Sequence, residues 1–135
     1  MKKVVLVTLV ALLSVGQLFA KHVDVNAAKS IGENYVRNNI SSLRGFQNSK
    51  HILTISDENG NACLYIFNIE DKGYYIVSAD DRAKPILAYS EEGSIDVNNI
   101  LPAMAYYLEH YKNAISYAIE NDLPAEKEIE EEWNS

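Results

Sequence analysis

The 135-residue chain contains a single cysteine, so no disulfide can form within it. A domain without disulfides must be held together by its hydrophobic core, and a chain of this length has room for one such domain. The cysteine itself, Cys63, falls in a strand-like apolar run, where we interpret it as a small core residue. The alternative is a thiol that reacts or pairs with another chain.

Motifs of enzyme chemistry are also absent. The sequence has no HExxH, GxSxG, P-loop or GxGxxG motif, and its three histidines have no metal-ligand spacing. We interpret His110 as a surface residue. The adjacent Asp80 and Asp81 could form a carboxylate pair or a metal site, but a turn with a local ion pair to Arg82 explains them more simply. We therefore expect no enzyme activity, metal or cofactor.

Positive charge is scarce. Removing residues 1–20 takes away two lysines and leaves 10 basic residues against 19 acidic ones, a formal charge of −9. Binding to nucleic acid needs clustered Lys and Arg that neutralise phosphates, so we exclude nucleic acid as a partner. This charge is typical of a soluble secreted protein, or of one with a basic protein partner.

Residues 1–20 have the pattern of a secretory signal peptide. Lys2 and Lys3 precede a short apolar run from Val4 to Val15, and Ala20 is a small residue at the expected cleavage position. The run is too short to span a membrane, and no cysteine follows it for a lipid anchor. We expect cleavage after Ala20 and export to the periplasm or the extracellular space, with no membrane association afterwards.

The central residues 64–89 predict a β-meander, because runs rich in aromatic and β-branched residues alternate with polar turns. We expect four strands, at 50–56, 62–69, 73–79 and 85–90. The short turns between them make neighbouring strands antiparallel. Such a sheet, with one apolar face, needs a cover of helices.

Two helices are predicted to supply that cover. Asp24 is placed to cap the first, which fades near Asn39. The second and longer helix is expected to start from a cap at Asn98 or Asn99 and to end near Asp122. The buried stripe of the long helix is expected to contain Leu101, Ala105, Leu108, Tyr111, Ile115 and Ile119.

The fold class is therefore α+β, a four-stranded antiparallel meander sheet packed against an N-terminal helix and a long C-terminal helix. This domain is expected to span residues 21–123, and residues 124–135 form an acidic tail. Ile129 and Trp133 are spaced i, i+4, so a short helical turn is the alternative for the tail. We attribute the nine tyrosines to core and rim packing rather than to a carbohydrate-binding platform.

Three runs of the chain, taken in order, point to one family. They are LYIFNI (64–69), GYYIVSADDRAKPILAYSEEGSID (73–96) and LEHYKNAI (108–115). The combination resembles the propeptide region of streptopain-type cysteine peptidases and the stand-alone inhibitors of the Spi family. One departure is Ala79, where the family often has glycine, although a small residue is kept. The resemblance covers essentially the whole of residues 21–135.

The resemblance implies a function. In this family the prosegment packs on a papain-like catalytic domain and blocks its cleft. Because the sequence stops at Ser135, where the linker to a peptidase would begin, we expect a free-standing, secreted bacterial inhibitor of a streptopain-type cysteine peptidase. The alternatives are an intramolecular chaperone or remnant of a truncated zymogen, and a secreted protein- or glycan-binding module.

The resemblance also implies a contact site. The family places the loop before its last helix near the peptidase active site, and this loop corresponds approximately to residues 96–102. Asn98 and Asn99 are the candidates for entering the substrate cleft, with Ile100 or Leu101 as an apolar anchor. Asp96 and Pro102 complete the candidate set. As an alternative, each asparagine is simply a helix cap.

Overall fold

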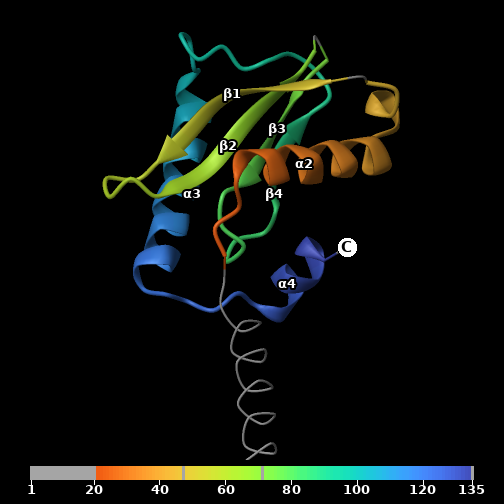
Figure 1. Cartoon of the computed structure of the whole chain (residues 1–135). Coiled ribbons are helices and arrows are strands. Elements are labelled where there is room, and N and C mark those ends of the chain that lie inside the picture. Colours follow the sequence, from red (N-terminus) through yellow and green to blue (C-terminus); the bar gives the residue numbers. More distant parts are fainter. Residues whose placement is uncertain (1–20, 47, 71, 135) are drawn as a thin grey trace, which may run out of the picture.

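The structure is a computed structural model that describes residues 21–46, 48–70 and 72–134 (Figure 1). The predicted signal peptide lies outside these residues. The elements, in chain order, are α2 (Val25–Asn39), the 3₁₀ helix η1 (Ser41–Leu43), β1 (Ser49–Ser56), β2 (Ala62–Ile69), β3 (Tyr74–Ser78), β4 (Ile86–Ser90), α3 (Pro102–Glu120) and α4 (Lys127–Trp133). None of the described helices is both long and apolar enough to cross a membrane.

The four strands form one antiparallel sheet in the order β1-β2-β3-β4, which confirms the predicted meander. The hairpin between β2 and β3 depends on glycine at position 73. Gly73 has a φ of +137°, and a Cβ at this position would lie 2.0 Å from the carbonyl oxygen of Ser90. Glycine is required here because a side chain would strain the backbone and collide with the start of the loop after β4.

Helices cover both faces of the sheet, which corrects the expectation of a single apolar face. Figure 1 shows α2 in front of the sheet and α3 behind it. Phe67 and Tyr75 belong to the core on the α2 side, whereas Leu64 and Ile66 belong to the core on the α3 side. Because β2 is buried on both faces, its side chains form a continuous apolar run instead of the alternation of a one-sided strand.

The first helix, α2, begins at the predicted cap, where Oδ1 of Asp24 accepts a hydrogen bond of 2.8 Å from a backbone amide of the first turn. Gly32 allows the helix to approach the sheet, since a Cβ there would lie 2.0 Å from a ring carbon of Tyr75. The hydroxyl oxygens of Tyr75 and Ser49 are 2.7 Å apart, and Ser49 Oγ donates to a carboxylate oxygen of Glu33 at 2.7 Å. The contact of Gly32 with the Tyr75 ring and the hydrogen bonds that connect Tyr75, Ser49 and Glu33 therefore fix α2 to the sheet.

The long helix, α3, begins later than predicted. Its N-cap is Leu101, which forms no side-chain cap hydrogen bond, and Pro102 is the first helical residue. Asn98 and Asn99 do not cap the helix, because both lie in a turn that precedes it. Pro102 suits the first helical position, where its missing amide hydrogen has no partner within the helix.

The buried stripe of α3 is correct except near its start. The predicted members that pack on the sheet are Leu108, Tyr111, Ile115 and Ile119. Leu101 and Ala105, by contrast, are exposed, and Met104 packs on the sheet near them. At Leu101 the prediction fails because the helical phase was extended into a turn that is not helical, whereas Ala105 lies within α3 on its exposed side.

Residues 127–133 form α4, so the helical alternative for the acidic tail is the one observed. The indole Nε1 of Trp133 donates a hydrogen bond of 2.8 Å to the carbonyl oxygen of Ala83, in the turn before β4. The Trp133 side chain also packs against the core on the α2 side. This short helix is therefore attached to the body of the domain.

Candidate functional site

The loop between β4 and α3, residues 91–101, is held to the sheet by one asparagine. The side-chain amide of Asn68 in β2 donates to the carbonyl oxygen of Ile95 at 2.9 Å, and its Oδ1 accepts from the Ile95 amide, also at 2.9 Å. Ile95 itself is buried in the core on the α3 side. This double hydrogen bond imitates strand pairing and fixes the middle of the loop.

The next residues form a tight turn. Oδ1 of Asp96 accepts a hydrogen bond of 2.9 Å from the Asn98 amide, and the Asp96 carbonyl oxygen accepts one of 3.0 Å from the Asn99 amide. Such aspartate turns are a common use of a short acidic side chain. The side chains of Asn98 and Asn99 are exposed and form no hydrogen bond to another described residue. Their amide groups are therefore available to a partner.

A small hollow lies between this turn and the start of α3. Its volume is about 140 Å³, and its lining includes Tyr74, Ile95, Ile100, Leu101 and Met104. Sites for drug-sized ligands are larger, about 300–1,000 Å³. The hollow is therefore too small for a drug-sized ligand, and its size is that of a single side chain.

Large apolar side chains are exposed beside the hollow. Leu101 is 67% exposed, Tyr106 is 73% exposed and Tyr107 is 59% exposed. The two tyrosine rings lie edge to face with their centroids 6.3 Å apart. We call Asn98, Asn99, Leu101, Tyr106 and Tyr107 the loop–helix surface. Exposed aromatic residues of this kind are typical of protein interfaces.

Tyr106 and Tyr107 were not predicted as site residues, because the tyrosines were attributed to core and rim packing. A signal was present, because two adjacent residues of a helix differ by about 100° in direction and cannot both face the core. The buried Leu108 follows directly, so three consecutive large residues had to include exposed ones.

The chain segment that forms the loop–helix surface is acidic, and Lys72 lies at the same end of the sheet. Between Lys84 and Lys112 the sequence contains no Lys or Arg, and its acidic residues there are Glu91, Glu92, Asp96 and Glu109. A partner with a basic rim would therefore be attracted to this part of the molecule.

The structure brings the six predicted site residues together at one end of α3. Ile100 is half-buried in the hollow, whereas Asp96, Asn98, Asn99, Leu101 and Pro102 are exposed. The carboxylate of Asp96 is occupied by the turn, so its role in the fold is structural. Contact of these residues with a peptidase stays a prediction.

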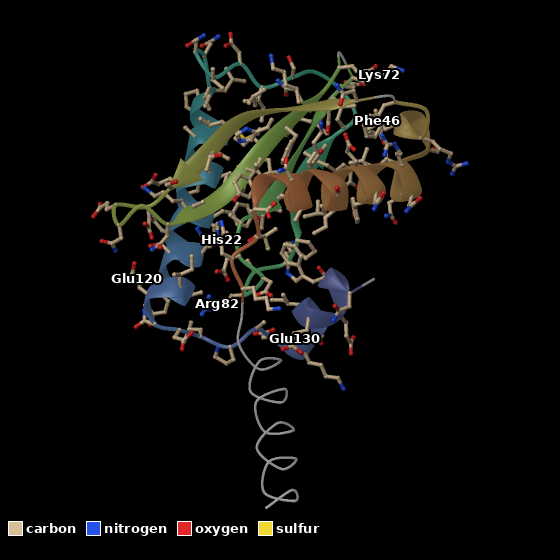
Figure 2. All side chains as sticks on the ribbon, viewed as in Figure 1. His22, Phe46, Lys72, Arg82, Glu120 and Glu130 are labelled. Atoms are coloured by element: carbon tan, nitrogen blue, oxygen red, sulfur yellow. The ribbon has the colours of Figure 1, made fainter. Side chains whose placement is uncertain are left out.

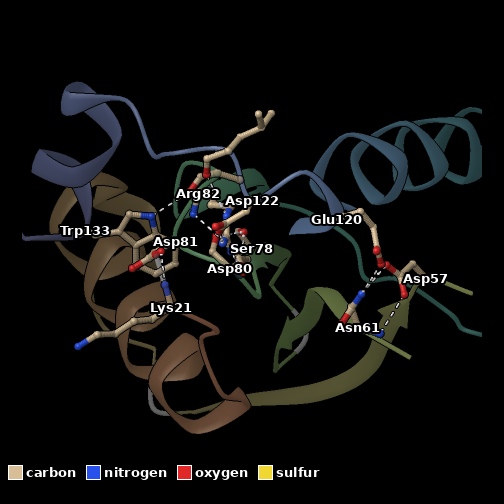
Figure 3. A network of polar contacts seen from close by, with 12 residues as sticks. Lys21, Asp57, Asn61, Ser78, Asp80, Asp81, Arg82, Glu120, Asp122 and Trp133 are labelled. Carbon is tan, nitrogen blue, oxygen red and sulfur yellow. Dashed lines mark hydrogen bonds and ion pairs between the residues drawn. The ribbon is translucent and has the colours of Figure 1, made fainter. Parts of the chain in front are cut away.

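The acidic turn after β3 has the predicted ion pair. Nη1 of Arg82 lies 3.0 Å from Oδ2 of the buried Asp80, and Arg82 Nε donates to the carbonyl oxygen of Leu123 at 3.0 Å (Figure 3). Arg82 also pairs with Asp122 just after α3. The turn is thus a structural junction between β3 and the end of α3. Among the described residues, no three His, Cys, Asp or Glu side chains are grouped to hold a metal ion.

The single thiol is part of the core, as predicted. Cys63 is fully buried, and its Sγ donates to the carbonyl oxygen of Asn61 at 3.4 Å. Burial raises the pKa of the Cys63 thiol to about 11. A thiol that is buried and protonated at neutral pH is a poor nucleophile.

The junction and the loop–helix surface lie at different ends of the molecule. In Figure 2, Lys72 marks the end of the sheet that carries the β2–β3 hairpin, and Arg82, Glu120 and Glu130 lie at the opposite end. The loop 91–101 starts beside this hairpin, since Ser90 contacts Gly73. The junction can therefore stabilise the fold at one end while the loop–helix surface stays exposed at the other.

Known proteins are similar to this chain in sequence. Streptopain of Streptococcus pyogenes is 38% identical over 63 residues, which are 44% of this chain and 16% of streptopain; the values are the same for the streptopains of serotype M1 and of serotype M3 strain SSI-1. This chain thus covers about one sixth of the length of these relatives. No solved structure is significantly similar.

The Spi protease inhibitor family matches residues 20–115, which contain the sheet, the loop 91–101 and most of α3. The chain therefore belongs to the Spi protease inhibitor family.

Proposed function

We propose that this domain is a secreted inhibitor of streptopain-type cysteine peptidases that blocks the active-site cleft without being fused to the peptidase. The proposal rests on one observation, the match of residues 20–115 to a protease inhibitor family. The exposed loop–helix surface lies within the matched residues and supports the proposal, because it combines unpaired amides with apolar anchors.

The mechanism follows from the way the loop is held. Asn68 and Asp96 fix the turn before binding, so little conformational entropy is lost when a partner closes over it. Asn98 and Asn99 then enter the cleft and present amide groups to the subsites. Leu101 and Tyr106 remain outside as apolar anchors. A rigid turn of this kind occupies the cleft without presenting an extended peptide bond for cleavage.

The negative charge of this region adds a preference for the target. Glu91, Glu92 and Asp96 would accelerate association with a peptidase whose cleft has a basic rim. The association rate is therefore expected to fall several-fold as salt rises from low to physiological ionic strength, since exposed charges are screened. Stopped-flow measurement of inhibition at several salt concentrations checks this.

The decisive experiment is a titration of residues 21–135 against an active streptopain-type peptidase, with papain as the control for specificity. Stoichiometric loss of activity with papain unaffected is expected. A folded and uncleaved domain that leaves the streptopain-type enzyme fully active would contradict the proposal and favour a secreted protein- or glycan-binding role.

Matched variants locate the contact. Leu101→Ala and Tyr106→Ala are expected to raise the inhibition constant about 10- to 100-fold, because exposed aromatic and apolar anchors are typical hot spots. Tyr117→Ala is the control, since Tyr117 is 63% exposed on the same helix but near its other end. Equal effects of Tyr106→Ala and Tyr117→Ala would disprove this location.

The asparagines are tested separately. Asn98→Ala combined with Asn99→Ala should preserve folding, because neither side chain is bonded to another described residue. Weaker inhibition is expected. Undiminished inhibition by the double variant would show that the turn does not enter the cleft.

The relation to streptopain favours a second candidate, a prosegment that assists folding of a peptidase. Refolding of a denatured streptopain-type peptidase with and without residues 21–135 separates the two roles. A chaperone increases the yield of active enzyme after the domain is removed, whereas a pure inhibitor leaves the yield unchanged.

A further inference from the structure

The first residues that the structure describes are built into the junction after β3. The Val23 amide donates to the carbonyl oxygen of Ala79 at 2.8 Å, and the Asp81 amide donates to the carbonyl oxygen of Lys21 at 3.0 Å. The Tyr65 hydroxyl donates to the carbonyl oxygen of Val23 at 2.7 Å. Residues near the start of the domain are thus held in a defined register rather than projecting freely.

The same register places the Lys21 backbone nitrogen on a carboxylate. This nitrogen lies 2.7 Å from Oδ1 of Asp81 (Figure 3). Arg82, the neighbouring cation, forms its ion pairs with Asp80 and Asp122 instead. Within the described part of the chain, the Lys21 nitrogen is therefore the group that donates a hydrogen bond to the Asp81 carboxylate.

Lys21 is also the first residue after the cleavage position that the signal-peptide pattern predicts. We propose that Asp81 is a binding site for the α-ammonium group that cleavage between Ala20 and Lys21 creates. A signal peptidase hydrolyses this bond with water: the leader keeps the new carboxylate of Ala20, and the Lys21 nitrogen becomes protonated. The amide–carboxylate hydrogen bond of the precursor then becomes an ion pair.

Only a chain that begins at Lys21 places its α-ammonium group beside the Asp81 carboxylate. The register fixes the Lys21 nitrogen beside Asp81, and each additional residue would carry the terminal charge about 3.3 Å further along the chain. Because Arg82 connects the same turn to Asp122, the new ion pair strengthens the junction that joins the N-terminus, β3 and the end of α3. This inference depends on the predicted cleavage and not on inhibition of a peptidase.

The test compares three forms of the domain. One starts with a free amine at Lys21, the second is acetylated on the Lys21 nitrogen, and the third carries Ala20 as an additional first residue. Urea unfolding is measured for each. The free form is expected to have an unfolding equilibrium constant about two- to fivefold lower than the other two, as for an ion pair at a protein surface.

The same three forms carrying Asp81→Asn are expected to unfold alike. Asp96→Asn is the control, because Asp96 lies at the other end of the domain and should preserve the difference between free and acetylated forms. The proposal is overturned if acetylation has no effect in the parent domain, or if its effect persists in Asp81→Asn. N-terminal sequencing of the exported protein must also give Lys21 as the first residue, and another first residue overturns it.

Discussion

At the scale of single residues, Gly32 determines how closely α2 approaches the sheet. We expect Gly32→Ala to lower the free energy of unfolding by about 1–3 kcal/mol, because the added methyl group would overlap the Tyr75 ring. This cost exceeds the gain in helix propensity, which is at most about 1 kcal/mol. Urea unfolding monitored by circular dichroism measures the difference.

Gly45→Ala provides the control for Gly32→Ala. A Cβ at Gly45 would meet no atom within 4 Å, so a change within about 0.5 kcal/mol is expected. Equal stabilities of the two variants would mean that α2 can shift away from Tyr75 without cost.

Another residue with an individual effect is Asp57, at the turn between β1 and β2. Its carboxylate accepts hydrogen bonds from the Ser116 hydroxyl of α3 at 2.6 Å and from the Asn61 side chain at 3.0 Å. These bonds, with that of Ser116 the strongest, lower the pKa of Asp57 from 3.8 to about 2. The ionised carboxylate therefore connects the hairpin to α3.

The lowered pKa of Asp57 predicts a dependence of stability on pH. Since the folded-state pKa lies below the unfolded one, the contribution is fully present above about pH 4 and is lost as the pH falls toward 2. Asp57→Asn should reduce the loss of stability between pH 5 and pH 2, and Ser116→Ala should reduce it partly. Urea midpoints across this range measure the loss, and an unchanged slope in Asp57→Asn would assign it to other carboxylates.

At the scale of elements, α3 has a buried face that stabilises the fold and an exposed face that we expect to contact the peptidase. Leu108→Ala, on the buried face, is expected to cost about 2–5 kcal/mol of stability, since it leaves a cavity against the sheet. Tyr107→Ala, on the exposed face, is expected to change stability by about 0.5 kcal/mol or less while weakening inhibition. Thermal unfolding and inhibition assays on both variants separate the two faces. Loss of stability in Tyr107→Ala would show that its ring supports the fold.

The strands and α2 could be predicted because their signals are local. The cap at Asp24 acts within a few residues and is confirmed. The start of α3 could not be predicted in the same way. Asn98 and Asn99 have good capping side chains, but Asp96 binds their backbone amides and holds them in a turn outside the helix.

At the scale of the whole molecule, the contacts that connect distant segments had no sequence signal. Two such contacts join residues that are far apart in the chain. They are the hydrogen bond between Asp57 and Ser116 and the pair of hydrogen bonds between Asn68 and Ile95. No local pattern reports such pairs, so the bonds that hold the candidate loop rigid could not be predicted from the sequence. The two-sided sheet, by contrast, had a sequence signal, because the continuous apolar run of β2 is typical of a strand that is buried on both faces.

The separation of the two ends of the molecule leads to a final prediction, for the domain shortened to residues 21–124. This truncation removes α4 and with it the Trp133 contact to Ala83, so stability should fall by about 1–2 kcal/mol, the value of a partly buried aromatic ring and one hydrogen bond. Inhibition should stay within about twofold, because distant sites act independently and Figure 1 places α4 at the end of the molecule opposite the start of α3. Denaturation midpoints and inhibition constants of the two lengths are the measurements. A large loss of inhibition by a shortened domain that is still folded would move the contact surface from the loop to α4.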